Sequence, residues 1–570
     1  MMQIFQLQYS RKLFQVLINR YSIFLLSMYL YVSIISLQGG MDSTAFFTQW
    51  VELIFLFYLY VYFYLILHPG RWRSLIAALP ILVGYLVQDF YYLVYGKVFR
   101  LISVLELPEL VQVIPLTDGM LIMIFMVMPL VVFFSVINYR KMHVISYGAL
   151  PLCLLTGLVV FSPDVYTDFV LGSGNGIVKY SDAKSVESNG RYTMMFYKEA
   201  ERQNALSMTS PYRNRNMLES KAEAMAAKLK RKGNNRNIHL IVLESFLDPR
   251  LFKRARFTTN PVHPDFERLF GENIGLSVSP VFGGATAQAE FEVLCGVPAL
   301  EKLSSVEFNV FSGAPVYCLP GLLDKAGYHS VATNAYKPNF FNAALAYKGT
   351  GFNKIYFPRE YTSNKNSYFS VGDVSKENYM FDGDLLDQNL AFVAKRLKET
   401  PNTPIFNYVM TIYGHMPHVM DDVRRPEVVR VLSDYPDDHL QRSTNQFYYR
   451  TQAIASYVNA LIKLDKNSII ILVSDHVPPL RNGPNTYRKL NYMNNVAGSF
   501  YYNRLMIIEN GQPIVHDDMK HFDLPDVVYN YITDGAHCRE QPCAFQNKAA
   551  SQDRQLLIEK YYSLMAHASE

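Results

Sequence analysis

The sequence predicts five transmembrane helices followed by an exported α/β domain with a mostly parallel sheet and flanking helices. Three observations support this: charge is distributed unevenly, five apolar stretches fill the first 161 residues, and strand-like and helix-like patterns alternate after residue 237. Half of the 570 residues are apolar and 14% are aromatic, which excludes a disordered chain. The net charge of +5, from 54 basic and 49 acidic residues, argues against nucleic acid as a partner.

Residues 1–161 form the predicted transmembrane domain. They hold only nine of the basic and six of the acidic residues. The apolar stretches lie at 21–37, 50–67, 75–94, 120–137 and 144–161, and each is close to the ~20 residues that cross a bilayer. A cleavable signal peptide is not expected, because four more apolar stretches follow the first.

The basic residues of the short loops predict the orientation of these helices. One side carries seven, which are Arg11, Lys12, Arg20, Arg71, Arg73, Arg140 and Lys141. The other side carries Lys97 and Arg100. This places the N-terminus in the cytoplasm and the residues after 161 outside. If one stretch lay flat in the interface, the span number would be even and the domain would be cytoplasmic.

Two acidic residues lie inside apolar stretches. Glu52 and Asp89 fall near the predicted outer ends of the second and third stretches. Carboxylates in a membrane often mark a function. The interpretation favoured here is that they reach the interface or are paired inside the bundle.

The cysteines agree with an exported domain. Cys538 and Cys543 enclose a short polar turn that a disulfide could close, and Cys295 with Cys318 is a candidate second bridge. A zinc site made from these four residues is less favoured, because no close Cys-x-x-Cys pair exists.

Residues 162–236 form a predicted connector, with helical composition at 191–206 and 217–231. Residues 237–570 form the predicted exported catalytic domain. Buried parallel strands are expected at 238–243, 330–333, 405–412 and 468–473, with helices such as 385–398 and 451–464 between them. Ligands of such sheets bind beyond the carboxyl ends of the strands, so the polar residues that follow each strand are the informative ones.

Candidate metal ligands follow two of these strands. Glu244 follows the first strand, and Asp475 and His476 follow the last. Thr286 comes after Gly283 and Gly284 at what looks like a helix start, where free N–H groups and the helix dipole favour an anion. Each residue alone has an ordinary structural explanation, such as a helix cap for Thr286.

Together these four residues predict a metal-activated nucleophile. Two carboxylates, one imidazole and one hydroxyl oxygen suit one divalent ion, for which Mn²⁺ is favoured and Zn²⁺ and Mg²⁺ are alternatives. A cation beside the Thr286 hydroxyl would lower its pKa and make it a nucleophile.

Three segments carry a family resemblance: Ile-Val-Leu-Glu-Ser at 241–245, Gly-Gly-Ala-Thr-Ala-Gln-Ala-Glu-Phe at 283–291, and Val-Ser-Asp-His at 473–476. With five spans ahead of an exported domain, they resemble the lipoteichoic acid synthase group of phosphoglycerol transferases in the alkaline phosphatase and sulfatase superfamily. The resemblance implies that Glu244, Thr286, Asp475 and His476 ligate the metal and that Thr286 is the nucleophile. It also implies that His415 contacts the substrate phosphate or assists proton transfer.

The resemblance implies a membrane-bound transferase, a multi-pass protein of the bacterial inner membrane whose catalytic domain faces the periplasm or the cell exterior. Its donor would be a membrane phospholipid, phosphatidylglycerol in the closest relatives, and its acceptor a glycan or cell-envelope polymer. The family's Phe-Trp-Asn-Arg element, whose Arg binds the donor headgroup, corresponds here to Phe340, Phe341, Asn342 and Ala343. Phe341 and Asn342 are therefore candidate substrate-binding residues, whereas Ala343 departs from the pattern. Lys337 or Lys348 could compensate, and His418 is a further candidate.

Three alternatives stay open at this point. A phosphoethanolamine transferase would use the same chemistry on phosphatidylethanolamine. A sulfatase is less favoured, because neither Cys295 nor Cys318 stands in a Cys/Ser-x-Pro-x-Arg setting. A membrane-anchored binding protein on an inactive enzyme fold is disfavoured by the complete metal set. The sequence leaves the acceptor, the metal and the oligomeric state open.

Overall fold

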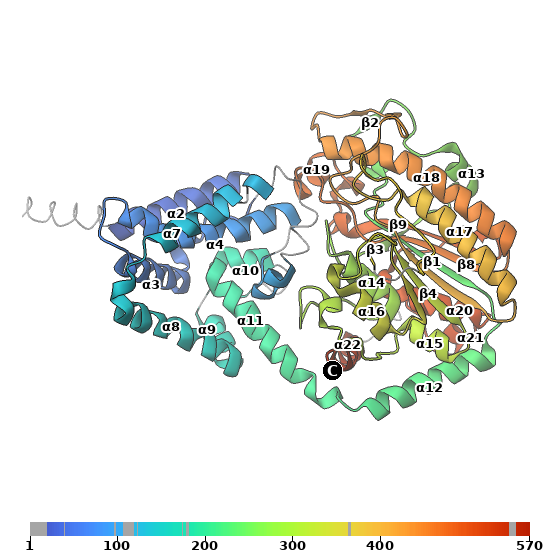
Figure 1. Cartoon of the computed structure of the whole chain (residues 1–570), viewed down its shortest axis with the longest axis horizontal. Helices are drawn as coiled ribbons and strands as arrows, with labels where there is room; N and C mark the ends of the chain where they lie inside the picture. The colour runs from blue at the N-terminus through green and yellow to red at the C-terminus, as the bar shows by residue number, and fades with distance from the viewer. Residues whose placement is uncertain are drawn as a thin grey trace, which may run out of the picture. The chain divides into compact units, whose positions relative to one another are not determined.

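The computed structural model describes residues 20–38, 40–95, 98–106, 119–121, 123–173, 175–177, 182–362, 366–546 and 554–570. The chain folds into two compact units, Met1–Leu206 and Ser207–Glu570. The boundary between them falls inside the connector predicted at 162–236. Figure 1 shows helices in the first unit and a sheet covered by helices in the second. Three residues used to predict the orientation, Arg11, Lys12 and Lys97, lie outside the described residues.

The first unit begins with apolar helices: α2 (Arg20–Leu37), α3 (Trp50–Ile66), α4 (Arg73–Tyr95), α7 (Met128–Ser135) and α8 (Met142–Phe161). Among the described residues, three segments are long and apolar enough to cross a membrane: Arg20–Leu37, Arg73–Leu93 and Tyr139–Phe161. Two shorter apolar helices, Trp50–Ile66 and Gly119–Ser135, coincide with the second and fourth predicted spans. Apolar helices for a membrane part are thus present, and the number of five spans stays a prediction.

The first unit ends with α9 (Pro163–Gly172), α10 (Asp182–Asn189) and the start of α11 (Arg191–Met208). The two acidic residues of the apolar stretches bind the beginning of α11. Glu52 accepts hydrogen bonds from the backbone N–H groups of Tyr192 and Thr193, at 3.1 and 2.8 Å. Asp89 Oδ1 pairs with Arg191 Nη2 at 2.6 Å. All of these charged side chains are buried, so pairing inside the bundle is the interpretation that the structure supports.

The second unit is built on one sheet, in which nine strands lie within the described residues. Its order is β11-β3-β9-β8-β1-β6-β4-β5, with β10 paired to β9. The strands are β1 (Ile238–Leu243), β3 (Gly275–Val278), β4 (His329–Asn334), β5 (Lys354–Tyr356), β6 (Ile405–Met410), β8 (Ile469–Ser474), β9 (Tyr502–Glu509), β10 (Gln512–Pro513) and β11 (Met519–Lys520). A separate pair joins β2 (Arg256–Phe257) to β7 (Val431–Leu432).

The four predicted strands are the parallel centre of this sheet, in the order β8-β1-β6-β4. Strands β1, β6 and β8 are buried at every position, which explains their continuous apolar sequence. The prediction did not include β9, which runs antiparallel to both β8 and β3. The polar Asn503 and Arg504 near its start interrupt the apolar run that would have revealed it.

Helices cover both faces of the sheet (Figure 1). The α-helices of the second unit, within the described residues, are α12 (Arg215–Lys232), α13 (Pro264–Phe270), α14 (Thr286–Cys295), α15 (Leu319–Lys325), α16 (Ala343–Thr350), α17 (Asp382–Glu399), α18 (Asp438–Leu464), α19 (Pro484–Lys489), α20 (Leu524–Ile532), α21 (Ala536–Glu540) and α22 (Arg554–Ala568). On β6, Asn407 bonds Asn389 of α17, whereas the next residue, Tyr408, bonds Glu290 of α14. Since successive strand residues point to opposite faces, α14 and α17 cover different faces.

Both predicted disulfides are present. Cys295, the last residue of α14, is bonded to Cys318, which precedes α15. Cys538 of α21 is bonded to Cys543. The first bond ties the end of α14 to α15, and the second closes the turn after α21.

Candidate active site

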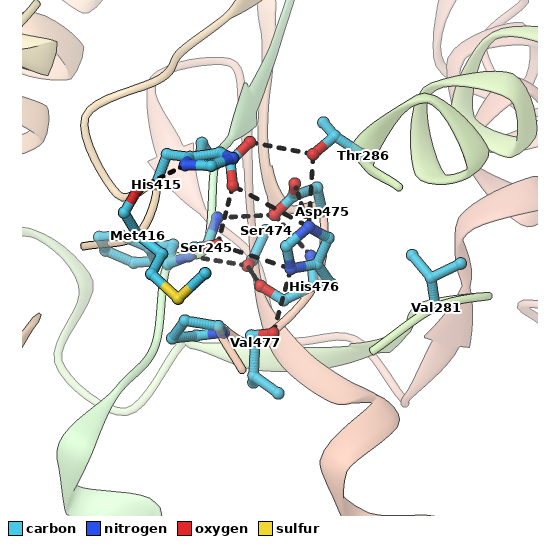
Figure 2. A network of polar contacts seen from close by, with 12 residues as sticks. Ser245, Val281, Thr286, His415, Met416, Ser474, Asp475, His476 and Val477 are labelled. Atoms are coloured by element: carbon cyan, nitrogen blue, oxygen red, sulfur yellow. Dashed lines mark hydrogen bonds and ion pairs between the residues drawn. The ribbon is translucent and has the colours of Figure 1, made fainter. Parts of the chain in front are cut away.

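The predicted metal ligands gather at the carboxyl ends of two adjacent strands. Glu244 follows β1, and Asp475 and His476 follow β8. These strands are parallel, and Leu243 lies opposite Ser474, so the residues that follow them emerge at the same edge. Each of the three offers a ligand atom within 4.8 Å of the other two, and all three are buried. Figure 2 shows Asp475 and His476 converging with Thr286.

Thr286 is brought to the same place by the start of α14. The helix begins at Thr286 itself, after Ala285 in a left-handed conformation with φ 58°. Thr286 Oγ1 donates a hydrogen bond to Glu244 Oε2 at 3.0 Å and lies 3.3 Å from His476 Nε2. Gly283 also has a positive φ, and a Cβ there would lie 3.1 Å from Pro479 Cβ, so the turn leaves little room for a side chain. The structure therefore brings together all four residues that the sequence analysis assigned to the metal.

The surrounding hydrogen bonds leave particular ligand atoms directed inward. Asp475 Oδ1 accepts the backbone N–H groups of Ser245 and His476, at 2.7 and 2.5 Å. Asp475 Oδ2 is buried and has no hydrogen-bond partner among the described residues. His476 Nδ1 lies 3.0 Å from the Val477 carbonyl oxygen, to which it can donate, and this tautomer leaves the Nε2 lone pair facing Asp475 Oδ2 at 3.2 Å.

The electrostatics of the cluster favour a cation. Burial raises the pKa of Glu244, and the adjacent Asp475 carboxylate raises it further. Burial also raises the pKa of Asp475 to about 7. Two buried carboxylates side by side are costly unless positive charge offsets them. The orphaned Asp475 oxygen, the inward imidazole nitrogen and the Thr286 hydroxyl thus fit a divalent metal ion.

A buried arginine supports this edge of the sheet. Arg450 of α18 is 2% exposed, and its Nε donates to Asp382 Oδ2 at 2.6 Å. Its Nη1 lies 3.5 Å from the carbonyl oxygen of Ser245. A Cβ on Gly414 would lie 2.0 Å from the Glu244 carbonyl oxygen and 2.4 Å from Arg450 Nη1, so only glycine fits there. Sequence reasoning missed Arg450, because it lies inside a long helix 68 residues from its partner and belongs to no local motif.

His415 lies in the loop after β6. Its ring is half-buried and packs against Tyr379, with 5.1 Å between ring centroids. Its Nδ1 lies 2.7 Å from the Met416 carbonyl oxygen, which leaves Nε2 as the nitrogen able to face a substrate. The charge of His415 reaches Glu244, whose pKa it lowers. His415 is thus beside the cluster without being one of its ligands (Figure 2).

The other candidate substrate-binding residues lie in and around the turn that precedes α16. Phe341 and Asn342 form the turn before α16, and the Asn342 side chain donates to the carbonyl oxygens of Phe308 and Phe311, both at 2.8 Å. The Lys337 ammonium lies 5.4 Å from the Tyr336 ring centroid. Lys348 is exposed on α16, and Ala343 is buried at its first position.

His418 is fully buried, and the structure does not place it with the metal ligands. Its Nδ1 lies 3.2 Å from Gln446 Oε1 of α18, and its ring packs near His439. Burial lowers the pKa of His418 well below the usual range. Within the described residues its contacts are those of a neutral packing residue, and a substrate contact stays a prediction.

A comparison with models of protein families identifies the family to which this chain belongs. A model described as Sulfatase matches residues 236–530, just over half of the 570 residues. The chain belongs to the sulfatase family. The match spans β1 through β9, and with them Glu244, Thr286, His415, Asp475 and His476. The superfamily that the sequence motifs predicted is therefore confirmed.

Two curated proteins resemble this sulfatase-family chain. One, from Rhizobium meliloti, is described as a candidate cyclic beta-1,2-glucan modification protein and is 25% identical over 269 residues, 46% of this chain and 38% of the relative. An uncharacterised protein of Haemophilus influenzae is 23% identical over 256 residues, 42% of this chain and 43% of the relative. The chain thus spans about two fifths of the length of these relatives.

Solved structures that resemble this chain include a phosphoglycerol transferase, a lipoteichoic acid synthase and a periplasmic domain. The phosphoglycerol transferase GacH of Streptococcus pyogenes, in complex with sn-glycerol-1-phosphate, has a TM-score of 0.47 and 17% identity, covering 62% of this chain and 91% of that one. The lipoteichoic acid synthase LtaP of Listeria monocytogenes has a TM-score of 0.41 and 17% identity, covering 53% and 72%. The periplasmic domain of EptC from Escherichia coli has a TM-score of 0.33 and 12% identity, covering 53% and 84%.

Proposed function

We propose that this sulfatase-family protein is a membrane-bound transferase. It moves the phosphate-linked headgroup of a phospholipid, phosphoglycerol from phosphatidylglycerol, onto a glycan or envelope polymer by way of Thr286. The observation that carries the proposal is the Thr286 hydroxyl, held at the start of α14 by Glu244 and next to His476 and the inward oxygen of Asp475. A lone helix cap would not need two buried carboxylates and an imidazole around it.

The first half of the reaction forms a covalent intermediate. The Thr286 oxygen attacks the phosphorus, the Thr286 Oγ–phosphorus bond forms, and the bond to the diacylglycerol oxygen breaks. Glu244 Oε2 accepts a hydrogen bond from the Thr286 hydroxyl and would take its proton during the attack, then return it when the Thr286 oxygen leaves in the second half. The α14 N-terminus faces the same place, where its free N–H groups favour the phosphoryl oxygens.

The second half transfers the headgroup phosphate to the acceptor. An acceptor hydroxyl attacks the phosphorus of phospho-Thr286, and the Thr286 oxygen leaves. His415, through Nε2, gives a proton to the departing diacylglycerol oxygen in the first half and takes one from the acceptor in the second. Glu244, Asp475, His476 and Thr286 would hold a divalent cation, for which Mn²⁺ is expected, and it would supply charge for the phosphoryl oxygens and lower the pKa of the Thr286 hydroxyl.

The location and one relative support the two substrates. The candidate spans in the first unit would keep the site at a membrane, where a phospholipid donor is abundant. The glucan-modifying relative from Rhizobium meliloti favours a glycan acceptor. On this proposal the second unit faces the periplasm or the cell exterior, which agrees with its two disulfides.

Sulfate-ester hydrolysis is a poorer explanation of the site. That chemistry needs a Cys or Ser that can be oxidised to formylglycine, and the residue at the α14 start is Thr286. Both Cys295 and Cys318 are held in a disulfide, so neither is available for conversion. Phosphatidylethanolamine is the alternative donor lipid, because Ala343 stands where the family's headgroup-binding Arg is expected. The experiment below distinguishes it from phosphatidylglycerol.

The test is incubation of the full chain with phosphatidylglycerol and, separately, phosphatidylethanolamine, each labelled in the headgroup. We expect diacylglycerol release and a headgroup-phosphate adduct on Thr286 detected by mass spectrometry. The mass of the adduct identifies the donor. No diacylglycerol from either lipid in metal-loaded protein would overturn the proposal.

A further inference from the structure

Five aromatic residues form a continuous surface beside His415, here called the aromatic shelf: Tyr336, Phe340, Phe341, Tyr361 and Tyr379. Tyr336 is central, with ring-centroid distances of 4.9 Å to Phe340, 5.8 Å to Tyr361 and 5.9 Å to Tyr379. Phe341 extends the surface from Phe340 at 4.5 Å. The shelf thus consists of rings from the loop after β4 and from the segment between β5 and α17.

The shelf is only partly covered by protein. Tyr336 and Tyr379 are each 7% exposed and form its inner part, whereas Phe340, Phe341 and Tyr361 are half-buried. No hydrogen bond joins the hydroxyl groups of its three tyrosines to the described residues, which omit 363–365, and none of the three is among the fully buried polar atoms that lack a partner, so they are open to solvent. Three accessible hydroxyl groups beside aromatic rings form a surface that can contact both the flat C–H face and the hydroxyl groups of a ligand.

These hydroxyl groups stay neutral. Burial raises the pKa of Tyr336 to about 12, and it raises the pKa of Tyr361 and Tyr379 above the usual range. Each hydroxyl can therefore both donate and accept a hydrogen bond at any physiological pH. Such a surface suits a ligand that carries many hydroxyl groups of its own.

The backbone holds the outer end of the shelf in a strained turn. Phe341 and Asn342 have consecutive positive φ values of 47° and 57°. Neither is glycine, so the turn costs free energy, which the two hydrogen bonds of the Asn342 side chain to Phe308 and Phe311 help to offset. This backbone conformation places the half-buried Phe341 ring against the Phe340 ring, and a turn with ordinary φ values would point the Phe341 side chain in another direction.

The inner end of the shelf adjoins the reacting groups. The Tyr379 ring packs against the His415 ring at 5.1 Å. The charge of Glu244 also raises the pKa of Tyr379, which places the hydroxyl within electrostatic reach of the metal-binding cluster. A ligand that lies along the shelf would therefore present one of its groups to His415.

We propose that the aromatic shelf binds a sugar ring of the acceptor glycan, and this rests on the transfer reaction proposed above. A pyranose has a flat C–H face that packs on aromatic rings and peripheral hydroxyl groups that match those of Tyr336, Tyr361 and Tyr379. Glycerol has no such flat face, and an acyl chain would leave the three tyrosine hydroxyls unpaired. In the transfer, the bond formed joins the bound sugar's oxygen to phosphorus, the bond broken is Thr286 Oγ–phosphorus, and His415 takes the sugar hydroxyl proton.

Binding is tested first without a donor. Saturation-transfer NMR on the detergent-solubilised full chain uses cyclic β-1,2-glucan, linear β-1,3-, β-1,4- and α-1,4-gluco-oligosaccharides, and glycerol. We expect at least one oligosaccharide to give signals from ring C–H protons, and glycerol to give none. Phe341→Ala and Tyr361→Ala should each weaken that binding about tenfold, the loss of one aromatic contact, and Tyr361→Phe by less. Tyr448→Ala on α18, whose ring packs on His263, is the matched control and should bind as wild type does.

The second measurement uses the partition of the headgroup between sugar and water. With labelled phosphatidylglycerol and the bound oligosaccharide, Phe341→Ala and Tyr361→Ala should lower the ratio of glycan transfer to hydrolysis about tenfold. If they lower diacylglycerol release and leave the ratio as in wild type, the shelf holds the donor and the inference is wrong. If no oligosaccharide binds, the inference is also wrong. If sugar binding is lost in the variants but wild type releases no diacylglycerol, the shelf stands and the proposed transferase function fails.

Discussion

At the scale of single residues, Thr286 combines two environments that rarely coincide. It is the first residue of a helix, and its hydroxyl is bonded to a buried carboxylate. The helix start favours an anionic phosphate, whereas the carboxylate accepts the hydrogen bond of the hydroxyl proton that must leave for the oxygen to attack. Only the second feature depends on the hydroxyl oxygen, so substitutions at this position separate phosphate binding from the chemistry.

Thr286→Ala is expected to lower lipid-dependent transfer at least about a thousandfold and to leave no phosphorylated adduct. Glu244, Asp475 and His476 remain, so some metal should still bind. Thr286→Ser keeps the oxygen and should retain part of the activity. The measurement combines transfer rates, adduct mass and metal content. Full transfer by Thr286→Ala would show that the Thr286 hydroxyl is not the nucleophile.

His415→Ala is expected to behave differently, because it removes no metal ligand. Metal content should match wild type, while transfer should fall about 10²- to 10⁴-fold, as for a lost acid–base group. Rates and metal analysis on the same preparation check this. A parallel loss of metal would mean that His415 belongs to the metal site.

At the scale of elements, α14 carries the nucleophile at one end and a disulfide at the other. Cys295 ends the helix and bonds to Cys318 ahead of α15. Between them, Glu290 accepts hydrogen bonds from the hydroxyl groups of Tyr347 and Tyr408, which belong to α16 and β6. The position of Thr286 is therefore held by contacts along the whole of α14.

Replacing Cys295 and Cys318 together by Ser should destabilise the second unit by about 3 kcal/mol, because the bond closes a long loop; the same change at Cys538 and Cys543 should cost about 2 kcal/mol. The sequence separations are 23 and 5 residues. Chemical denaturation of each double variant measures the loss.

In the wild-type protein, all four cysteines should resist alkylation until they are reduced. Ready labelling of the native exported protein would contradict the pairing.

The buried carboxyl of Glu307, which follows α14 in the chain and contacts α22, should make the stability of the second unit depend on pH. Burial raises the pKa of Glu307 from the ordinary 4.5 to about 7, and its Oε1 accepts from the Tyr561 hydroxyl of α22 at 3.1 Å. The folded state therefore holds this proton more tightly than the unfolded chain. The resulting stability is complete below about pH 4.5 and is lost as the pH rises to about 7.

Glu307→Gln removes this titration and keeps the acceptor oxygen. As the pH rises from about 5 to about 8, we expect the free energy of unfolding of the variant to increase relative to that of wild type by up to about 3 kcal/mol. Unfolding at the two pH values checks the difference, with the exposed Glu272→Gln as the control. An equal shift in both variants would show that the effect is one of net charge.

At the scale of the whole molecule, the basic residues of the short loops predict that the second unit lies outside the cytoplasm. The disulfides favour an oxidising compartment.

A reporter enzyme active only outside the cytoplasm, fused after Gly172, should be active. The same reporter fused at Arg71 should be inactive, and a cytoplasmic reporter should give the reverse pattern. Activity in the opposite places would reverse the compartment and exclude an extracellular donor lipid.

Much of this architecture could be predicted because its signals are local. A fully buried parallel strand is a continuous apolar run, and the residues that follow β1 and β8 stand out against it. Glu244, Asp475 and His476 were found in this way. Thr286 was found because two glycines precede it.

What could not be predicted depends on contacts between distant segments. Arg450 and Asp382 look like ordinary charges of helical surfaces until α17 and α18 are packed together. The aromatic shelf joins segments on both sides of β5, and no spacing in the sequence reveals that Tyr336 and Tyr361 meet. Burial of His418 likewise follows from its packing against α18.

The pairing of Asp89 with Arg191 has a consequence for how the protein is made. The two residues are 102 positions apart, and both are buried within the first unit. At synthesis rates of about 5–20 residues per second, Asp89 waits on the order of 5–20 s for its partner to leave the ribosome. During that interval the third apolar helix carries an uncompensated carboxylate, so the bundle cannot be completed before α11 is translated. A nascent chain arrested ahead of Arg191 should therefore be more open to proteolysis than one arrested after Leu206.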